Sequence, residues 1–156
     1  MNQLKTPLGT LHFWSGARGL AAAQFECEWQ APAGVRRGAD RGSVEAFERY
    51  FAGEALAFND VDLDLHGSDY ARRVWAALRE LGPKLTSYGT LAQALDSAPR
   101  AIGRAVGANP VLIAVPCHRV VGARGELRGY AAGLTRKRWL LTHEGRVGTS
   151  LRHAQP

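Results

Sequence analysis

The chain has 156 residues, 46% of them hydrophobic, and a formal net charge of +6; this length allows one large core or two small domains. Its two cysteines, Cys27 and Cys117, lie far apart in the sequence, which excludes a disulfide framework and a Cys-x-x-Cys metal site. No apolar signal segment opens the chain and no apolar run is long enough to span a membrane, so we expect a cytoplasmic protein (nuclear in a eukaryote) without a membrane partner.

Charge is distributed unevenly along the chain. Residues 1–66 hold 6 Lys and Arg against 9 Asp and Glu, a net charge of −3, whereas residues 67–156 hold 14 against 5, a net charge of +9. This change of character predicts a domain boundary between residues 66 and 67. The strongly basic second half indicates a polyanionic partner; the alternative is an ordinary solvated basic surface.

The first half reads as a small α/β domain. Residues 4–29 read as β-structure, and residues 8–25 within them show the two apolar runs and the glycine turn of a hairpin or meander. Residues 31–42 are predicted to be a loop. Ser43 is a suitable N-cap for a helix that ends at Gly53. Residues 58–65 alternate between apolar and acidic side chains, which predicts a half-buried strand. We therefore expect a small antiparallel sheet with one helix.

The second half reads as mainly α-helical. Ser68 or Asp69 can cap its first helix, and Thr135 can cap a last helix over residues 136–143. Residues 146–156 read as a frayed tail.

Between these helices, two short helical patterns joined by a tight turn, over about residues 90–107, look like a helix-turn-helix. In the second of them, one arc is apolar and the opposite arc contains Arg100, Gly103, Arg104 and Gly107. Because a glycine inside a helix costs about 1 kcal/mol relative to alanine, this smooth, arginine-edged face indicates close contact with another surface. We favour DNA over packing against protein, because the whole half is basic.

Cys117 follows the apolar run 110–115, and Pro116 should push Val115 into an extended conformation and end strand pairing there. His118 and Arg119 stand beside the thiol, and neighbouring bases favour the thiolate that a nucleophile needs. A cysteine among apolar residues is often a small core side chain, but a core strand rarely buries two basic groups in succession. We therefore interpret Cys117 as reactive.

Six short motifs follow one another in the second half. They are Thr86-Ser87-Tyr88-Gly89, the helix that begins at Arg100, Asn109-Pro110, Pro116-Cys117-His118-Arg119-Val120, Gly129-Tyr130 and His143-Glu144-Gly145. Together they resemble the motifs of the O6-alkylguanine-DNA alkyltransferases. The strong match covers residues 70–145, whereas residues 1–66 resemble that family's N-terminal domain only in their pattern of strands and helix.

The resemblance implies that Cys117 attacks the alkyl carbon on guanine O6 and keeps it as a thioether, so that each molecule acts once, without a cofactor. His118 would remove the thiol proton through a water, because successive residues on an extended chain point apart, and Glu144 would orient this histidine. The resemblance also implies that Tyr88 protonates the departing guanine, that Asn109 fixes the loop before the nucleophile, and that Lys137 assists the leaving group.

The implied partner is double-stranded DNA that contains O6-alkylguanine, bound in its minor groove by a monomer. A base must rotate out of the stack to reach a buried thiol, and Arg100 would take its place. The expected DNA contacts are Arg100, Arg104, Gly103, Ala101, Thr90 and Arg119, and the expected pocket residues are Tyr130, Ala131, Ala132 and Val120. Ala132, where the family commonly has glycine, bears on how bulky an alkyl group the pocket accepts.

Three other functions stay open. A non-catalytic relative that flags alkylated DNA would lack Cys117; a helix-turn-helix transcription regulator would need a dimerisation or ligand domain; a Cys–His hydrolase would need an oxyanion hole. We expect no metal site. The aspartates from Asp60 onward imitate a calcium loop, but Leu65 stands where glycine is needed, and Cys27 and His12 are too few to bind zinc.

Overall fold

The computed structural model describes residues 1–54 and 56–145. The chain forms two compact units, one built from Met1–Gly67 with Pro110–Ala114, the other from Ser68–Asn109 with the chain from Val115 onward. A boundary between independently folding domains after residue 66 stays a prediction, since the segment 110–114 beyond it is grouped with the first unit. Across the described ranges, no helix combines the length and the apolar character needed to cross a bilayer.

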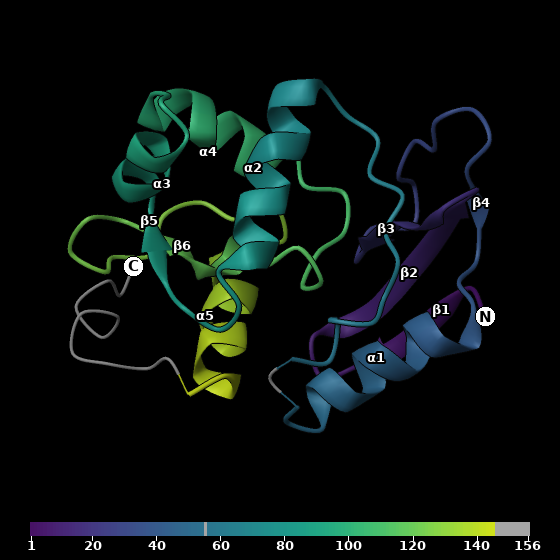
Figure 1. Cartoon of the computed structure of the whole chain (residues 1–156). Coiled ribbons are helices and arrows are strands. Elements are labelled where there is room, and N and C mark those ends of the chain that lie inside the picture. Colours follow the sequence, from purple (N-terminus) through teal and green to yellow (C-terminus); the bar gives the residue numbers. More distant parts are fainter. Residues whose placement is uncertain (55, 146–156) are drawn as a thin grey trace. The chain divides into compact units, whose positions relative to one another are not determined.

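The first unit is organised on an antiparallel sheet (Figure 1). Its strands are β1 (Gln3–Thr6), β2 (Gly9–Gly16), β3 (Gly19–Gln24) and β4 (Arg36–Arg37), and β2 pairs with each of the other three. The hairpin predicted over residues 8–25 is confirmed as β2 and β3. The loop predicted over residues 31–42 is wrong at β4, because Arg36 and Arg37 pair with Ser15 and Trp14 of β2.

Helix α1 (Arg41–Phe51) lies along the sheet (Figure 1) and packs on it through aromatic rings. The ring of Phe47 lies 5.2 Å from that of Phe13 on β2. The prediction that Ser43 caps this helix is wrong. Asp40 is the N-cap, and its carboxylate accepts the backbone N–H of Ser43 at 2.7 Å, so that Ser43 becomes a buried residue of the first turn.

The strand predicted over residues 58–65 is also wrong, because the segment turns at its start and then makes a single parallel bridge, between Leu63 and Leu20 of β3. Leu20 donates its N–H to the carbonyl of Asp62, and Asp64 donates to the carbonyl of Leu20. The alternation of apolar and acidic residues that suggested a strand is therefore not matched by a strand pairing, and the segment meets the sheet at one bridge.

The segment Pro110–Ala114 joins the first unit in a similar way. Ala23 of β3 donates to the carbonyl of Pro110 at 2.9 Å and accepts from Leu112 at 3.1 Å. The turn that follows places the buried Ile113 at a φ of 74°, a conformation that a β-branched residue rarely adopts. This strained turn directly precedes the chain that carries Cys117.

The second unit is mainly helical, as Figure 1 shows. Its elements are α2 (Asp69–Glu80), β5 (Thr86–Ser87), α3 (Tyr88–Ala94), α4 (Pro99–Gly107), the 3₁₀ turn η1 (Cys117–Arg119), β6 (Val120–Val121) and α5 (Leu134–His143). The predicted helix-turn-helix is confirmed as α3 and α4. The fold class, an α/β part with one helix and a mainly α part, is confirmed as well.

Helix α2 holds the helix-turn-helix in place. Its Trp75 is buried and donates its indole N–H to the carbonyl of Ala105 on α4 at 2.8 Å, and the hydroxyl of Tyr70 lies 2.6 Å from that of Ser97 in the turn between α3 and α4. Because both helices are tied to one support, the exposed face of α4 is presented on a fixed base.

Helix α5 begins one residue before the predicted cap, at Leu134, so the capping role predicted for Thr135 is wrong. The preceding Gly133 has a φ of 93°, which a residue with a side chain would adopt at a cost. The tail predicted over residues 146–156 lies outside the described residues.

Candidate active site

A two-stranded parallel pairing brings the chain before α3 alongside the chain after Cys117. Thr86 and Ser87 of β5 pair with Val120 and Val121 of β6. Ser87 is also the N-cap of α3, because its hydroxyl accepts the N–H of Thr90 at 3.0 Å. Tyr88, the first residue of α3, is thereby held close to the nucleophile loop.

Cys117 lies in a tight turn, not on an extended chain. Cys117 donates its N–H to the carbonyl of Val115 across Pro116, which has φ −81° and ψ 61°, the geometry of an inverse γ-turn. Arg119 then donates to the carbonyl of Pro116 at 3.0 Å. The extended chain expected at Cys117 and His118 is wrong, because each of these local hydrogen bonds closes a turn.

Asn109 connects the end of α4 with the nucleophile. Its buried side-chain amide donates to the carbonyl of Val115 at 2.8 Å and to Sγ of Cys117 at 3.0 Å. One side chain therefore holds both the loop before the cysteine and the sulfur itself.

The thiol of Cys117 is protonated at neutral pH. Burial raises its pKa to about 11, and this outweighs the opposing hydrogen bond from Asn109 and the charge of Lys137. The expectation that neighbouring bases favour the thiolate is therefore wrong in this state of the protein. Sequence neighbours do not decide the ionisation, because only 1% of Cys117 is exposed to solvent.

His118 is buried and bound to a carboxylate. Its Nε2 lies 2.5 Å from Oε2 of Glu144. Burial lowers the pKa of His118, although Glu144 opposes this, so the imidazole is neutral near pH 7. Burial would by itself raise the pKa of Glu144, but the hydrogen bonds and charges of His118 and Arg119 lower it to about 2.

The ionised carboxylate determines which ring nitrogen of His118 carries the proton. A carboxylate only accepts hydrogen bonds, so Nε2 must carry a proton and donate it to Glu144. Nδ1 then has a free lone pair. This buried atom has no hydrogen-bond partner among the described residues, so it can accept a proton.

Arg119 points into the protein. Its Nε donates to Oε1 of Glu144 at 2.7 Å, a terminal nitrogen donates to the carbonyl of Gly82, and the side chain is 7% exposed. The structure therefore separates Arg119 from the other residues predicted to contact DNA.

Lys137 is fully buried below the loops that surround the site. Its ammonium donates to three carbonyls, those of Val120 and Arg128 at 2.6 Å and that of Gly129 at 3.1 Å. Burial lowers its pKa to about 8, against the opposing effect of Cys117. Each of its three N–H bonds thus has a carbonyl acceptor.

The remaining predicted pocket residues lie around this loop. Val120 is buried in β6, and the ring of Tyr130 lies 6.4 Å from that of His118, edge to face. Ala131 and Ala132 continue the same loop and stay predictions as pocket residues.

The outer face of the helix-turn-helix is open. Arg100, Arg104 and Thr90 are exposed, and Ala101 is partly buried. A side-chain carbon added at Gly103 would meet no atom of the protein within 4 Å, and the same holds for Gly107. The smooth face predicted from the sequence is therefore free to lie against another molecule.

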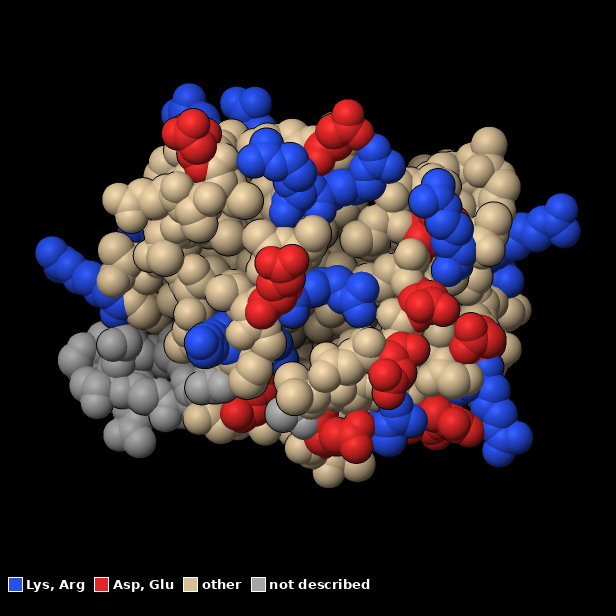
Figure 2. Space-filling model, viewed as in Figure 1, with Lys and Arg blue, Asp and Glu red and all other residues tan. Residues whose placement is uncertain are grey.

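Beside this face is a cavity of about 570 Å³. Residues from α3, α4 and the loop after β6 line it, among them Tyr88, Arg100, Gly103, Glu126 and Arg128. A phenol, two guanidinium groups and a glycine surface are thus gathered at one hollow. Figure 2 shows, by contrast, acidic side chains gathered over α1 in the first unit.

The family profile described as "6-O-methylguanine DNA methyltransferase, DNA binding domain" matches residues 69–146. The chain is also 38% identical over 147 residues to a Haemophilus influenzae protein named methylated-DNA–protein-cysteine methyltransferase, which covers 89% of this chain and 82% of that protein. This chain belongs to the 6-O-methylguanine DNA methyltransferase family.

Two further members of this family extend the comparison. A Mycolicibacterium paratuberculosis protein, also named methylated-DNA–protein-cysteine methyltransferase, is 51% identical over 108 residues, which is 67% of this chain but only 65% of that protein. The crystal structure of Mycobacterium tuberculosis OGT in complex with DNA superposes with a TM-score of 0.80 at 37% identity, over 95% of this chain and 94% of that chain.

Within this methyltransferase family site, sequence reasoning did not identify the loop residues Glu126 and Arg128 or the contact between Arg119 and Gly82. The alternation of charge in Arg124, Glu126 and Arg128 was the available signal for the loop. The partner of Arg119 had no signal, because Gly82 lies far away in the sequence.

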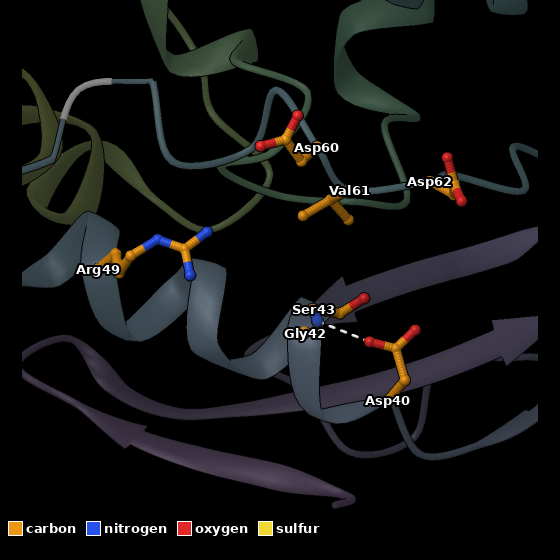
Figure 3. Close-up of a pocket in the computed structure, with 7 residues that line it drawn as sticks. All are labelled: Asp40, Gly42, Ser43, Arg49, Asp60, Val61 and Asp62. Carbon is orange, nitrogen blue, oxygen red and sulfur yellow. Dashed lines mark hydrogen bonds between the residues drawn. The ribbon is translucent and has the colours of Figure 1, made fainter.

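A smaller cavity, of about 210 Å³, lies in the first unit between α1 and the chain that follows it (Figure 3). Its lining includes Asp40, Asp60, Asp62 and Arg49. Asp40 is engaged as the cap of α1 (dashed line in Figure 3), and Arg49 donates to Glu54 and to the carbonyl of residue 57. In residues 1–54 and 56–145, no three His, Cys, Asp or Glu side chains are placed to bind a metal ion.

Proposed function

We propose that this protein repairs alkylated DNA by transferring an alkyl group, above all methyl, from O6 of guanine in double-stranded DNA to Sγ of Cys117. Membership of the family and the names of its relatives support this reaction. The observation that carries it is a buried thiol followed directly in the chain by a buried histidine that has an ionised carboxylate on Nε2 and an open acceptor at Nδ1.

The proton of the thiol must leave before or during attack, because a thiol with a pKa of about 11 is a weak nucleophile at neutral pH. We assign the base to Nδ1 of His118 and propose that it acts through a water. The carboxylate of Glu144 then stabilises the imidazolium that forms. A sulfur–carbon bond forms while the bond from that carbon to O6 breaks, and guanine departs with the electron pair.

The departing guanine needs a proton, and we assign its donor to Tyr88. Burial raises the pKa of Tyr88, with a further contribution from Cys117 and an opposing one from Arg128. The phenol therefore holds its proton at neutral pH and can donate it. Together, the proton taken up by His118 and the proton given by Tyr88 balance the transfer.

Asn109 and Lys137 act as positioning residues in this scheme. Asn109 holds the sulfur and the loop before it through its two hydrogen bonds. Lys137 holds the chain at Val120 and at the loop of Arg128 through its three. Since all three N–H donors of Lys137 are engaged, we propose that Lys137 positions these segments and does not assist the leaving group directly.

We propose that DNA binds along α4, with the target nucleotide rotated out of the duplex. Arg100, Arg104, Gly103, Ala101 and Thr90 are the contacts proposed, and Arg119 supports Glu144 from inside. The open surface at the glycines suits the minor groove of DNA. We propose that the protein acts on DNA as a monomer. Its place of action is the compartment that contains the DNA, which in a bacterium is the cytoplasm.

The product is a thioether, which water does not readily cleave, so each molecule should react once. The test is the intact mass of the protein after incubation with a duplex that contains one O6-methylguanine. We expect the gain of a single methyl group, located on Cys117 by peptide mapping. The variant Cys27→Ser removes the other, exposed cysteine and should gain the methyl group as the wild type does, whereas Cys117→Ser should stay unmodified.

Other outcomes would favour the alternatives. A wild-type protein that binds the duplex and stays unmodified would be a flagging protein or a transcription regulator. Repeated turnover of another substrate would indicate a hydrolase.

A further inference from the structure

The loop between β6 and Tyr130 is closed around the side chain of Glu126. Gly122 donates its N–H to the carbonyl of Glu126 at 2.8 Å. The Glu126 carboxylate accepts the backbone N–H of Arg124 at 2.9 Å and a guanidinium N–H of Arg128 at 3.1 Å. It lies where a side chain at position 122 would stand, since a carbon added to Gly122 would come within 2.2 Å of it.

This carboxylate faces a hollow that is otherwise suited to an anion. Glu126 and Arg128 line the same cavity as Arg100 and Tyr88. The side chain of Arg128 is 64% exposed, and that of Glu126 is 32% exposed. The charge of Arg128 reaches the reaction site, because it opposes the rise in the pKa of Tyr88 that burial and Cys117 cause.

The backbone of Arg128 is anchored while its side chain is not. Lys137 donates to the carbonyl of Arg128 at 2.6 Å from inside the protein. The guanidinium of Arg128, on the solvent side, donates to Glu126. The guanidinium can therefore change partner without moving the loop.

A carboxylate that accepts from a backbone N–H and a guanidinium occupies the donors that a DNA phosphate would use. Ion pairs exposed to solvent contribute little net stability, so a phosphate can replace the carboxylate. An acid at this place is unexpected for a DNA-binding surface, since residues 67–156 contain 5 Asp and Glu against 14 Lys and Arg.

We propose that Arg128 is a further DNA-phosphate-binding residue of this site, and that Glu126 holds its guanidinium until a phosphate of the bound strand displaces the carboxylate. Glu126 thus weakens binding to DNA in general, because its carboxylate competes with phosphate for Arg128. The loss of DNA affinity is smallest where the bound strand enters the cavity fully. The proposal rests on the proposed function for its choice of ligand, DNA.

The test is a double-mutant cycle with Glu126→Gln, Arg128→Gln and the double variant. Affinity for an undamaged duplex is measured by fluorescence anisotropy at several salt concentrations. The Arg128→Gln variant should bind more weakly, and the slope of log K against log salt should flatten by roughly 0.9, the value for one phosphate contact. The Glu126→Gln variant should bind roughly two- to fivefold more tightly, and this gain should vanish when Arg128 is also replaced.

Asp69 and Arg72 of α2 form a matched control, an exposed ion pair that does not line the cavity. If Asp69→Asn tightens binding as much as Glu126→Gln, or if Glu126→Gln acts equally with and without Arg128, the gain reflects net charge alone and the proposal is overturned. An unchanged salt slope in Arg128→Gln overturns it as well. Thermal unfolding of each variant checks that the fold is intact.

Methyl transfer to the wild type, read by intact mass, separates the two proposals. If methyl is transferred but the cycle shows no coupling, only the role of Arg128 fails. If the coupling is found but no methyl is transferred, the repair function fails while the phosphate contact stands.

Discussion

Replacing Glu144 by glutamine should destabilise the second unit strongly. The side chain of Glu144 is 5% exposed, and its two oxygens accept from His118 and Arg119, which are themselves buried. The substitution preserves the shape of the side chain but removes its charge. Arg119 then stays buried without an anionic partner, and that is the costly consequence.

The magnitude follows from the pKa of Glu144. Burial raises this pKa, but the two basic partners lower it from an ordinary 4.5 to about 2. Since one pKa unit corresponds to about 1.4 kcal/mol, the folded protein favours the carboxylate by roughly 3 kcal/mol. Breaking a buried ion pair by removal of one partner typically costs roughly 3–5 kcal/mol, so both routes give a loss near 3 kcal/mol.

The assay is urea unfolding at pH 7, with Asp69→Asn as the control. Asp69 belongs to the same unit but forms an exposed pair with Arg72, so its replacement should change the free energy of unfolding by roughly 0–1 kcal/mol. If Glu144→Gln falls within the range of the control, the carboxylate is not the buried anchor described here, and the reasoning is refuted.

Three further predictions follow from the same contacts. On acidification, the free energy of unfolding should decrease below pH 6.5, because burial lowers the pKa of His118 in the folded protein. It should decrease again between pH 4.5 and about 2, where Glu144 binds a proton in the unfolded chain before it does so in the folded protein. A constant free energy of unfolding in urea from pH 6.5 to 3 would contradict this. Asn109→Ala should slow single-turnover methyl transfer roughly tenfold by releasing the sulfur and its loop, and an unchanged rate would show that Asn109 does not position them. Gly103→Ala should raise the free energy of unfolding by up to about 1 kcal/mol and weaken DNA binding. If DNA binding is unaltered, α4 is not the surface that contacts DNA.

Sequence patterns predicted the elements whose signals are local. The hairpin of β2 and β3 follows from apolar runs around a glycine turn, and α4 follows from an apolar arc that the structure buries at Ile102, Ala105 and Val106. The two basic residues beside Cys117 drew attention to it, and its reactivity stays a prediction. Each of these signals is contained in a short stretch of chain, so no knowledge of distant contacts was needed.

The wrong predictions concern elements whose structure depends on contacts between distant parts of the chain. Asp40 and Ser43 are both good N-caps by residue type, and the structure places Asp40 at the cap and buries Ser43 in the first turn. The alternating segment 58–65 lacks a neighbouring strand to pair with along its length, and periodicity cannot show this.

The electrostatics of the site were the least predictable part. Adjacent bases suggested a thiolate at Cys117, yet burial, which the whole fold determines, raises the pKa to about 11. Arg119 was expected to contact DNA, but its side chain pairs with Glu144 inside the protein. The acceptor role proposed for Nδ1 of His118 follows only from the carboxylate that holds Nε2.

The account depends most on permanent methylation of Cys117, and a titration measures this directly. A fixed amount of protein is incubated with increasing excess of duplex that carries O6-methylguanine with a radioactive methyl group, and the label on the protein is counted. The account predicts a plateau at one methyl group per molecule, absent in Cys117→Ser. Label that rises beyond one per molecule, or that persists in Cys117→Ser, would contradict it.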